Sequence, residues 1–172
     1  MKIYIIIFIC FASSISFAQK IATIELSYIF QNIKEYQLLL DELENFKKDN
    51  YDKLKLEEEN LIQLKKEIQD QKVILNDQEY NKQITEYKEL GDIFTKKVDT
   101  INIYLQENIE YNEKILLEEI SKIVTNIISD ANISLVFNEN QYFISSVDLD
   151  ISNLVIDELN KKKLNLKIIE NK

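Results

Sequence analysis

From residue 28 to residue 129 the sequence contains no Pro and a single Gly. Pro interrupts a helix and Gly weakens one, whereas the Glu, Lys, Gln, Leu and Ile that dominate this stretch are all adequate helix formers. So few turn-forming residues leave little scope for tight turns. The sequence therefore predicts a chain that is mainly α-helical, with most of its residues in very long helices.

Apolar residues in this stretch recur at coiled-coil spacing, in two stripes that are out of phase with each other. The first stripe is an imperfect heptad, and the second is more regular although it includes Asn108 and Asn112. We interpret the stripes as the two sides of one seam. The predicted seam residues are Leu40, Leu43, Leu54, Leu61, Leu64, Ile68, Ile84, Tyr87, Phe94, Val98, Ile101 and Leu105.

The residues at the phase break favour a turn rather than a stutter in one continuous helix. Asn76 can cap a helix, Glu79 lies three residues later, and Leu75 and Tyr80 are spaced as a hydrophobic staple. These residues predict an antiparallel helical hairpin over residues 28–129. Its arms would cover about 28–73 and 77–129, joined at a tip near 74–76.

The composition excludes most classes of catalytic site. The sequence has no His and one Cys, so Cys–His nucleophilic sites and metal sites built on His or Cys are excluded. Two-carboxylate chemistry survives, but the acidic residues lie mostly at solvent-facing helical positions, with Lys three or four residues away as in ion pairs. A carboxylate-dependent hydrolase is therefore the weaker alternative, and we expect no enzyme, cofactor or metal site.

Residues 1–18 have the pattern of a secretory signal peptide. Lys2 gives a positive start, residues 3–12 are apolar, and Ser16 and Ala18 are the small residues of a cleavage site after Ala18. The alternative is an uncleaved anchor, for which the apolar run is short. We therefore predict an exported protein. Cleavage would leave 20 Lys against 30 Asp and Glu, a balance that argues against nucleic acid as a partner.

The two ends of the mature chain, 19–27 and 130–160, predict a small body. Residues 20–26 alternate as a strand, and Ser27 is the expected N-cap of the helix that follows. Residues 133–137 and 141–145 predict a β-hairpin, preceded by a left-handed cap at Asn132. A last helix is expected to begin near Asp150 or Ser152.

Three short strands and one short helix bury too little apolar area to be stable alone, so we expect other copies of the chain to complete the body. The residues expected in this oligomeric body are Ile21, Ala22, Ile24, Leu26, Leu135, Val136, Phe137, Tyr142 and Ile144. Residues 161–172 are rich in Lys, and we interpret them as a solvated basic tail whose contact with a membrane stays open.

The order of elements and both ends of the mature chain resemble the Skp/OmpH family of periplasmic chaperones. At the start, the resemblance rests on residues 20–26 (KIATIEL) followed by Ile29, Phe30 and Gln31. At the end it rests on Leu135, Val136, Phe137, Asn138, Tyr142, Leu149, Asp150, Ile151, Ser152, Val155, Leu159 and Asn160. The resemblance covers nearly the whole mature chain.

The resemblance implies a homotrimer with a small, barrel-like β body, from which three coiled-coil hairpins project as tentacles around a cavity. In that family the cavity holds unfolded outer-membrane proteins without ATP, and the outer-membrane insertion machinery is a further implied partner. Apolar residues off the predicted seam would then contact the client. These candidates are Tyr51, Leu56, Ile62, Val73, Ile103 and Tyr104.

The chain departs from the family pattern in its charge. Familiar members carry basic tentacles that are proposed to engage lipopolysaccharide, whereas this hairpin is neutral to acidic and has no Arg. We therefore carry over no lipopolysaccharide site. The main alternative is a structural coiled-coil protein of the cell envelope, which would explain the heptads and the export but not the two strand-forming ends.

Overall fold

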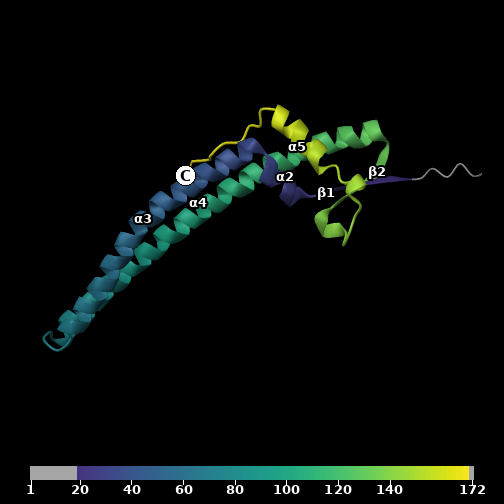
Figure 1. Ribbon diagram of the computed structural model, residues 1–172. Coiled ribbons are helices and arrows are strands. Elements are labelled where there is room, and N and C mark those ends of the chain that lie inside the picture. The colour runs from purple at the N-terminus through teal and green to yellow at the C-terminus, as the bar shows by residue number, and fades with distance from the viewer. Residues whose placement is uncertain (1–18, 171–172) are drawn as a thin grey trace, which may run out of the picture.

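The computed structural model describes residues 19–170, so the predicted signal peptide lies outside the described residues. Two long helices form a hairpin that projects from a small body at its open end (Figure 1). The expected mainly helical class with a small sheet is confirmed. In chain order the elements are β1 (Lys20–Ile24), α2 (Leu26–Asn32), α3 (Lys34–Gln71), α4 (Asp77–Ala131), β2 (Ile133–Asn138), the 3-10 turns η1 (Glu139–Gln141) and η2 (Val147–Leu149), and α5 (Ser152–Lys161).

The hairpin pairs α3 with α4 in antiparallel orientation, and its turn covers residues 72–76. Asn76 is the N-cap of α4, and its side-chain oxygen accepts a hydrogen bond of 2.9 Å from the backbone N–H of Glu79. This local bond satisfies one of the free N–H groups at the start of the helix. At 1.5 Å per residue, α4 is roughly 80 Å long.

The sequence predicted one continuous helix for the first arm, but the arm is interrupted. The chain leaves the helical conformation at Ile33, between α2 and α3, where φ is −87° and ψ is 112°. Asn160 holds this break from α5, since it accepts from the backbone N–H of Lys34 and donates to the carbonyl of Asn32. The bend places the buried Ile33 in the core of the body.

The sheet has two parallel strands, β1 and β2, with Ile21 opposite Leu135 and Ile24 opposite Asn138. A parallel pair needs a long crossover connection, which here is the whole helical hairpin. The predicted strand at 141–145 was wrong. Asn138 instead caps η1, with its Oδ1 accepting from the N–H of Asn140 and its own N–H donating to the side chain of Gln141, so the chain turns away from the sheet.

Asn132 ends α4 in the left-handed conformation, with φ 53° and ψ 43°, and is the one described non-Gly residue at positive φ. Asn tolerates this region better than other non-Gly residues, and a β-branched side chain tolerates it poorly. We expect Asn132→Val to destabilise the protein by about 1–2 kcal/mol, whereas Asn132→Gly should be close to neutral or slightly stabilising. Thermal unfolding followed by circular dichroism tests both. Equal melting of the two variants would contradict this view of the cap.

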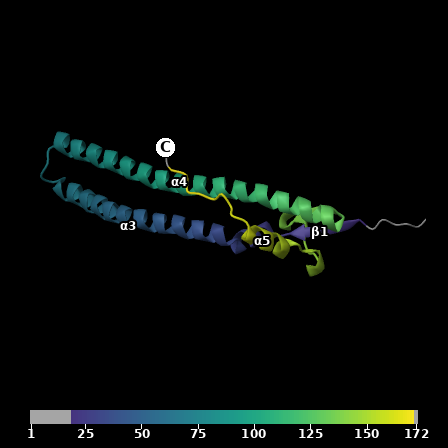
Figure 2. The ribbon, with the colours of Figure 1, turned by 90° about the horizontal axis from the view of Figure 1, so that it is seen from above.

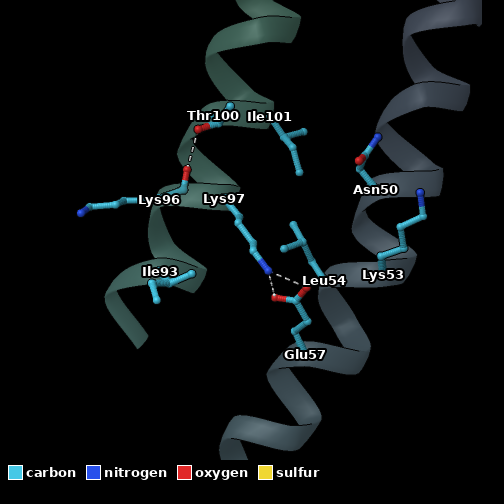
Figure 3. Close-up of a pocket in the computed structure, with 9 residues that line it drawn as sticks. All are labelled: Asn50, Lys53, Leu54, Glu57, Ile93, Lys96, Lys97, Thr100 and Ile101. Carbon is cyan, nitrogen blue, oxygen red and sulfur yellow. Dashed lines mark hydrogen bonds and ion pairs between the residues drawn. The ribbon is translucent and has the colours of Figure 1, made fainter. Parts of the chain in front are cut away.

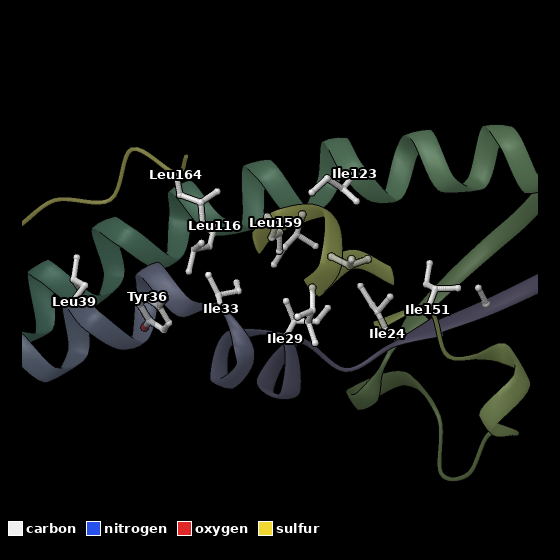
Figure 4. Packing of buried hydrophobic residues seen from close by; sticks show 14 of the residues in the cluster. Ile24, Ile29, Ile33, Tyr36, Leu39, Leu116, Ile123, Ile151, Leu159 and Leu164 are labelled. Atoms are coloured by element: carbon white, nitrogen blue, oxygen red, sulfur yellow. The ribbon is translucent and has the colours of Figure 1, made fainter. Parts of the chain in front are cut away.

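The core lies where α2, α3, α4 and α5 meet under the sheet (Figure 4). Ile29, Ile33, Leu116, Val155 and Leu159 are completely buried there. The short helix α5 lies against both α2 and α4, and its buried face consists of Val155 and Ile156 with Leu159 one turn later. This packing joins the two ends of the chain, which would otherwise be separate short segments.

The sequence predicted a solvated basic tail after the last helix, but most of this segment packs on the hairpin. The described part after α5, residues 162–170, runs in extended form back along the hairpin, seen in yellow in Figures 1 and 2. Leu164 is 5% exposed and belongs to the core, while Leu166 and Ile168 pack against it. Within residues 19–170, no helix combines the length and the hydropathy that crossing a membrane requires.

Candidate binding surface

Two apolar surfaces remain open to solvent, one on the body and one along the hairpin. The body surface surrounds the loop after η1, where Phe143 is fully exposed and Ile144 is 82% exposed. Val147, Leu149 and Leu154 are further exposed apolar side chains of the body. Several large exposed apolar side chains in one region are typical of surfaces that another molecule covers.

The residues predicted for the oligomeric body divide between the core of one chain and this open surface. Ala22 and Ile24 are buried, and Leu26, Val136, Phe137 and Tyr142 are half-buried. Ile21, Leu135 and Ile144 are exposed. Within one chain the buried and half-buried residues are therefore already packed, whereas the three exposed residues are largely open to solvent.

The twelve predicted seam residues all face the interior of the hairpin, because each is buried or half-buried. The packing is uneven along the seam. Near the body the helices enclose fully buried side chains such as Leu43 and Leu116, but between residues 77 and 107 no residue of α4 is fully buried. The distal half of the seam is thus partly accessible to solvent.

A groove follows this distal half between α3 and α4 (Figure 3). Its part nearest the body has a volume of about 470 Å³ and an apolar floor that includes Leu54, Ile93 and Ile101. Further depressions continue it past Leu61, Leu64, Leu90 and Phe94 to Ile68 and Tyr87 near the tip. The groove therefore presents aliphatic and aromatic side chains over several helical turns.

Charged groups lie at the edges of the groove and not in its floor. Lys97 of α4 forms an ion pair with Glu57 of α3 across it, with 2.7 Å between Nζ and Oε2 (Figure 3). Both side chains are about half exposed, so this pair contributes little to stability. Lys53 and Lys96 also line the groove. The stems of such long side chains can cover part of the apolar lining while their charged ends stay in water.

Five of the six predicted client contacts are exposed on the hairpin, namely Tyr51, Leu56, Ile62, Val73 and Ile103. Tyr104, the sixth, is half-buried. Its ring packs on Phe46 of α3, with 4.6 Å between the centroids, and it lies against the core. The phenol of Tyr51 donates to the side chain of Asn102 at 2.9 Å, so it also ties α3 to α4.

Leu90 and Ile93 line the groove and are about half exposed, but they were not among the residues predicted from the sequence. Leu90 lies three residues from both Tyr87 and Ile93 and four residues from Phe94, so the spacing along α4 held the signal. A heptad assignment allots each apolar residue either to the seam or to the surface. Where a groove lies between two helices, the residues beside the seam form its wall and are therefore part of the seam and of the surface at once.

A buried hydroxyl crosses the hairpin close to the body. Tyr36 of α3 is 3% exposed and donates to Oε1 of Glu113 on α4 at 3.1 Å. Burial, together with the neighbouring Glu113 carboxylate, raises the pKa of this phenol well above its ordinary value. The hydroxyl therefore stays protonated at neutral pH and serves as a fixed donor between the helices.

Glu139 of η1 caps α2, a role the sequence assigned to Ser27. Its carboxylate accepts from the backbone N–H groups of Leu26 and Ser27 at 2.9 and 3.0 Å. Partial burial opposes ionisation of Glu139, but these two bonds and the Ser27 hydroxyl outweigh it and lower its pKa. The cap ties the loop that carries Phe143 to the first helix of the body.

A lowered pKa in the folded state means that the stabilisation by Glu139 is present at neutral pH and is lost as the pH falls through that pKa. We expect Glu139→Gln to lower the stability at pH 7 by up to about 1 kcal/mol, and the difference from wild type to shrink toward pH 3. Thermal melts at several pH values measure this. Glu59→Gln, on the exposed face of α3, is the control and should follow wild type throughout. A pH-independent difference would contradict the carboxylate cap.

Over residues 19–170, no group of three or more Asp and Glu side chains is arranged to hold a metal ion. The family model described as outer membrane protein (OmpH-like) matches residues 20–159. A search of curated proteins found no match. Among solved structures, the crystal structure of a candidate outer membrane chaperone (OmpH-like) from Caulobacter crescentus CB15 is similar, with a TM-score of 0.63 and 10% identity over 83% of this chain and 85% of that chain.

At that identity the structural match shows the shared fold alone. The family model, in contrast, spans both segments of the body and the whole hairpin, which is well over half of the sequence. The chain therefore belongs to the OmpH-like family of outer membrane proteins.

Proposed function

We propose that this chain is an ATP-independent holdase chaperone that binds unfolded outer-membrane proteins and prevents their aggregation. Family membership supports a chaperone role, and so does the fold shared with the candidate chaperone from Caulobacter crescentus. The observation that carries the proposal is the distal groove, because the exposed apolar side chains of Leu90 and Ile93 line it along a hairpin that stands clear of the body.

Such a groove suits an unfolded barrel protein. The strands of a membrane barrel alternate apolar and polar side chains, and in water their apolar side chains and free backbone edges promote aggregation. Many shallow apolar contacts, each weak, can hold such a chain without selecting one conformation. The exposed client candidates Leu56, Ile62 and Ile103 extend this surface onto the outside of the hairpin.

The working form in this proposal is a homotrimer, in which the clients occupy the cavity between three hairpins. The exposed Phe143 and Ile144 support it, since both are almost fully open to solvent and belong to the body at the open end of the hairpin, where the family body would assemble. Ile21 and Leu135 add exposed apolar area on the neighbouring strands. Packing these side chains between chains would complete a body that is small on its own.

The predicted signal peptide and the family both favour the periplasm as the site of action. Handover to the outer-membrane insertion machinery belongs to the same proposal and rests on the family alone. No catalytic role is proposed, again on the basis of the family. Because the chain is acidic overall, we propose apolar contact as the main means of holding the client, and no site for lipopolysaccharide.

The proposal predicts that the groove variant Leu90→Asp/Ile93→Asp protects clients poorly. Both side chains are about half exposed, so the fold should tolerate the change, while two carboxylates would repel an apolar client segment. Losing about 1.4 kcal/mol of binding would raise the amount of protein needed to halve aggregation about tenfold. The measurement is turbidity of a barrel protein diluted from urea, without nucleotide.

The matched control is Thr85→Asp/Thr95→Asp, which adds the same charge on exposed positions of α4 outside the groove. It should protect the client as wild type does. If wild type itself leaves the turbidity unchanged at a stoichiometric trimer, the protein is not a holdase and the structural coiled-coil alternative is favoured. If both double variants weaken protection equally, charge and not the groove is responsible.

A further inference from the structure

The extended segment 162–170, which we call the strap, lies on α3 and α4 without forming a helix or a sheet (Figures 1 and 2). Its side chains alternate. Leu164, Leu166 and Ile168 turn toward the core, whereas Lys163, Asn165 and Lys167 are exposed, and the alternation ends at Ile169, which is half-buried. Alternation with a period of two is the pattern of a β-strand. The strap thus presents one apolar face to the helices, as a strand presents one face to a sheet.

Two completely buried Asn side chains of α4 hold the backbone of the strap. Asn112 accepts from the N–H of Lys167 and donates to its carbonyl, both at 2.9 Å. Asn108 accepts from the N–H of Ile169 at 2.7 Å and donates to its carbonyl at 3.3 Å. Each amide therefore forms the two-bond pairing that a neighbouring strand would form. We call each Asn side chain with its two bonds to the strap an amide fork. The two forks are one helical turn apart and bind alternate residues of the strap.

The orientation of both amides is fixed by α4 itself. The Nδ2 of Asn108 also donates to the carbonyl of Tyr104, and that of Asn112 donates to the carbonyl of Asn108. Further along, the side chain of Glu35 accepts from the N–H of Leu164 at 3.0 Å. These five bonds all involve the backbone of the strap, and its side chains add one longer bond, from Lys162 Nζ to Oε2 of Glu119 at 3.4 Å. Recognition here depends on an extended backbone and on apolar residues at every second position.

The forks are costly to leave unoccupied. Asn108 and Asn112 lie at positions of the heptad stripe where apolar residues would pack better, and buried amides without partners destabilise a protein. The strap satisfies them, and it lies beyond the residues that the family model matches, which end at 159.

We propose that Asn108 and Asn112 form a binding site for an extended peptide with alternating apolar residues, and that the chain's own strap occupies this site in competition with clients. The inference rests on the proposed function, because an unfolded barrel strand is the ligand with this pattern. The strap then regulates access to the part of the hairpin nearest the body. A client strand that displaces it would gain the same four amide bonds.

The test uses a fluorescein-labelled peptide with the sequence of residues 162–172 as the probe, and the full-length mature protein. In Leu166→Asp a carboxylate replaces a half-buried Leu, so the strap should be released and the amides of Lys167 and Ile169 should exchange hydrogen faster. The peptide should bind this variant at least about tenfold more tightly than wild type, whose tethered strap competes at high effective concentration. Urea-unfolded barrel protein should displace the peptide.

The control Asn165→Asp adds the same charge to the neighbouring, exposed residue and should behave as wild type. Adding Asn108→Leu/Asn112→Leu to Leu166→Asp keeps the positions apolar but removes the forks, and should abolish peptide binding. If the variant with both Asn changes loses its helical circular dichroism, Asn112→Leu alone is combined with Leu166→Asp instead. Equal peptide binding by Leu166→Asp and wild type, or slow exchange of the strap in Leu166→Asp, would overturn the proposal, as would peptide binding that persists without the forks.

Failure of this inference is distinguishable from failure of the proposed function. If wild type suppresses aggregation of the barrel protein while Leu166→Asp binds no peptide, the strap is structural only and the holdase proposal stands. If the peptide binds as expected and wild type gives no protection, the site recognises extended peptides in another context.

Discussion

Replacing Leu116 by Asp is expected to remove most of the stability of the body. Leu116 is completely buried where α4 meets the rest of the core, in a cluster of aliphatic and aromatic side chains. The variant loses the apolar burial of Leu and adds a carboxylate that must be desolvated without a partner. A cost of about 5 kcal/mol is expected, which is comparable with the whole stability of many domains.

The measurement is thermal unfolding followed by far-ultraviolet circular dichroism. For a chain of this size, a loss of about 5 kcal/mol lowers Tm by roughly 10–20 °C or leaves no folded baseline. Leu117→Asp is the matched control, since Leu117 is the next residue of α4 and is 43% exposed. It should melt within a few degrees of wild type. Similar melting of the two variants would show that Leu116 is not enclosed as described.

The second large effect concerns assembly. We expect Phe143→Asp/Ile144→Asp to convert the proposed trimer into single chains. Both side chains are almost fully exposed in one chain, so the change should cost the isolated fold little, but every interface of a symmetric trimer would receive the new charges. Light scattering after gel filtration gives the mass, which should fall from three chains to one.

The control for assembly lies at the opposite end of the molecule. Val73 and Ile74 at the tip are 94% and 84% exposed, so Val73→Asp/Ile74→Asp makes the same chemical change away from the body. This variant should keep the mass of three chains. A wild-type protein that is a folded monomer, or a Phe143→Asp/Ile144→Asp variant that remains trimeric, would contradict the proposed use of the body surface.

The elements that could be predicted from sequence are those whose causes are local. The turn at 72–76 has its N-cap, Asn76, next to the helix it starts, and the long helices follow from composition and period. The left-handed cap at Asn132 is likewise encoded in one residue. Each of these depends on interactions within a few positions of the chain.

The elements that could not be predicted depend on distant partners. The break at Ile33 is held by Asn160, and α2 is capped by Glu139, each more than one hundred residues away. The parallel pairing of β1 with β2 is equally non-local, and it replaced the expected hairpin because η1 turns the chain aside. Local patterns indicate which conformations a segment can adopt, whereas these distant contacts determine which of those conformations it adopts.

The candidate binding surface shows the same division. Heptad spacing predicted which residues face the interior, but it could not show where the helices diverge and open a groove beside Leu90 and Ile93. The strap did leave a local signal, since Leu164, Leu166 and Ile168 alternate and two Asn interrupt the stripe. Connecting them required knowing that the end of the chain returns along α4.

The proposed function requires the assembled hairpins to hold an unfolded barrel protein in solution. The most direct measurement is gel filtration with light scattering of the mature protein mixed with an outer-membrane barrel protein as the latter is diluted from urea, without nucleotide. The expected result is a soluble complex whose mass equals three chains plus one client. A client found only in the pellet, with this protein eluting at its own mass, would contradict the proposed function.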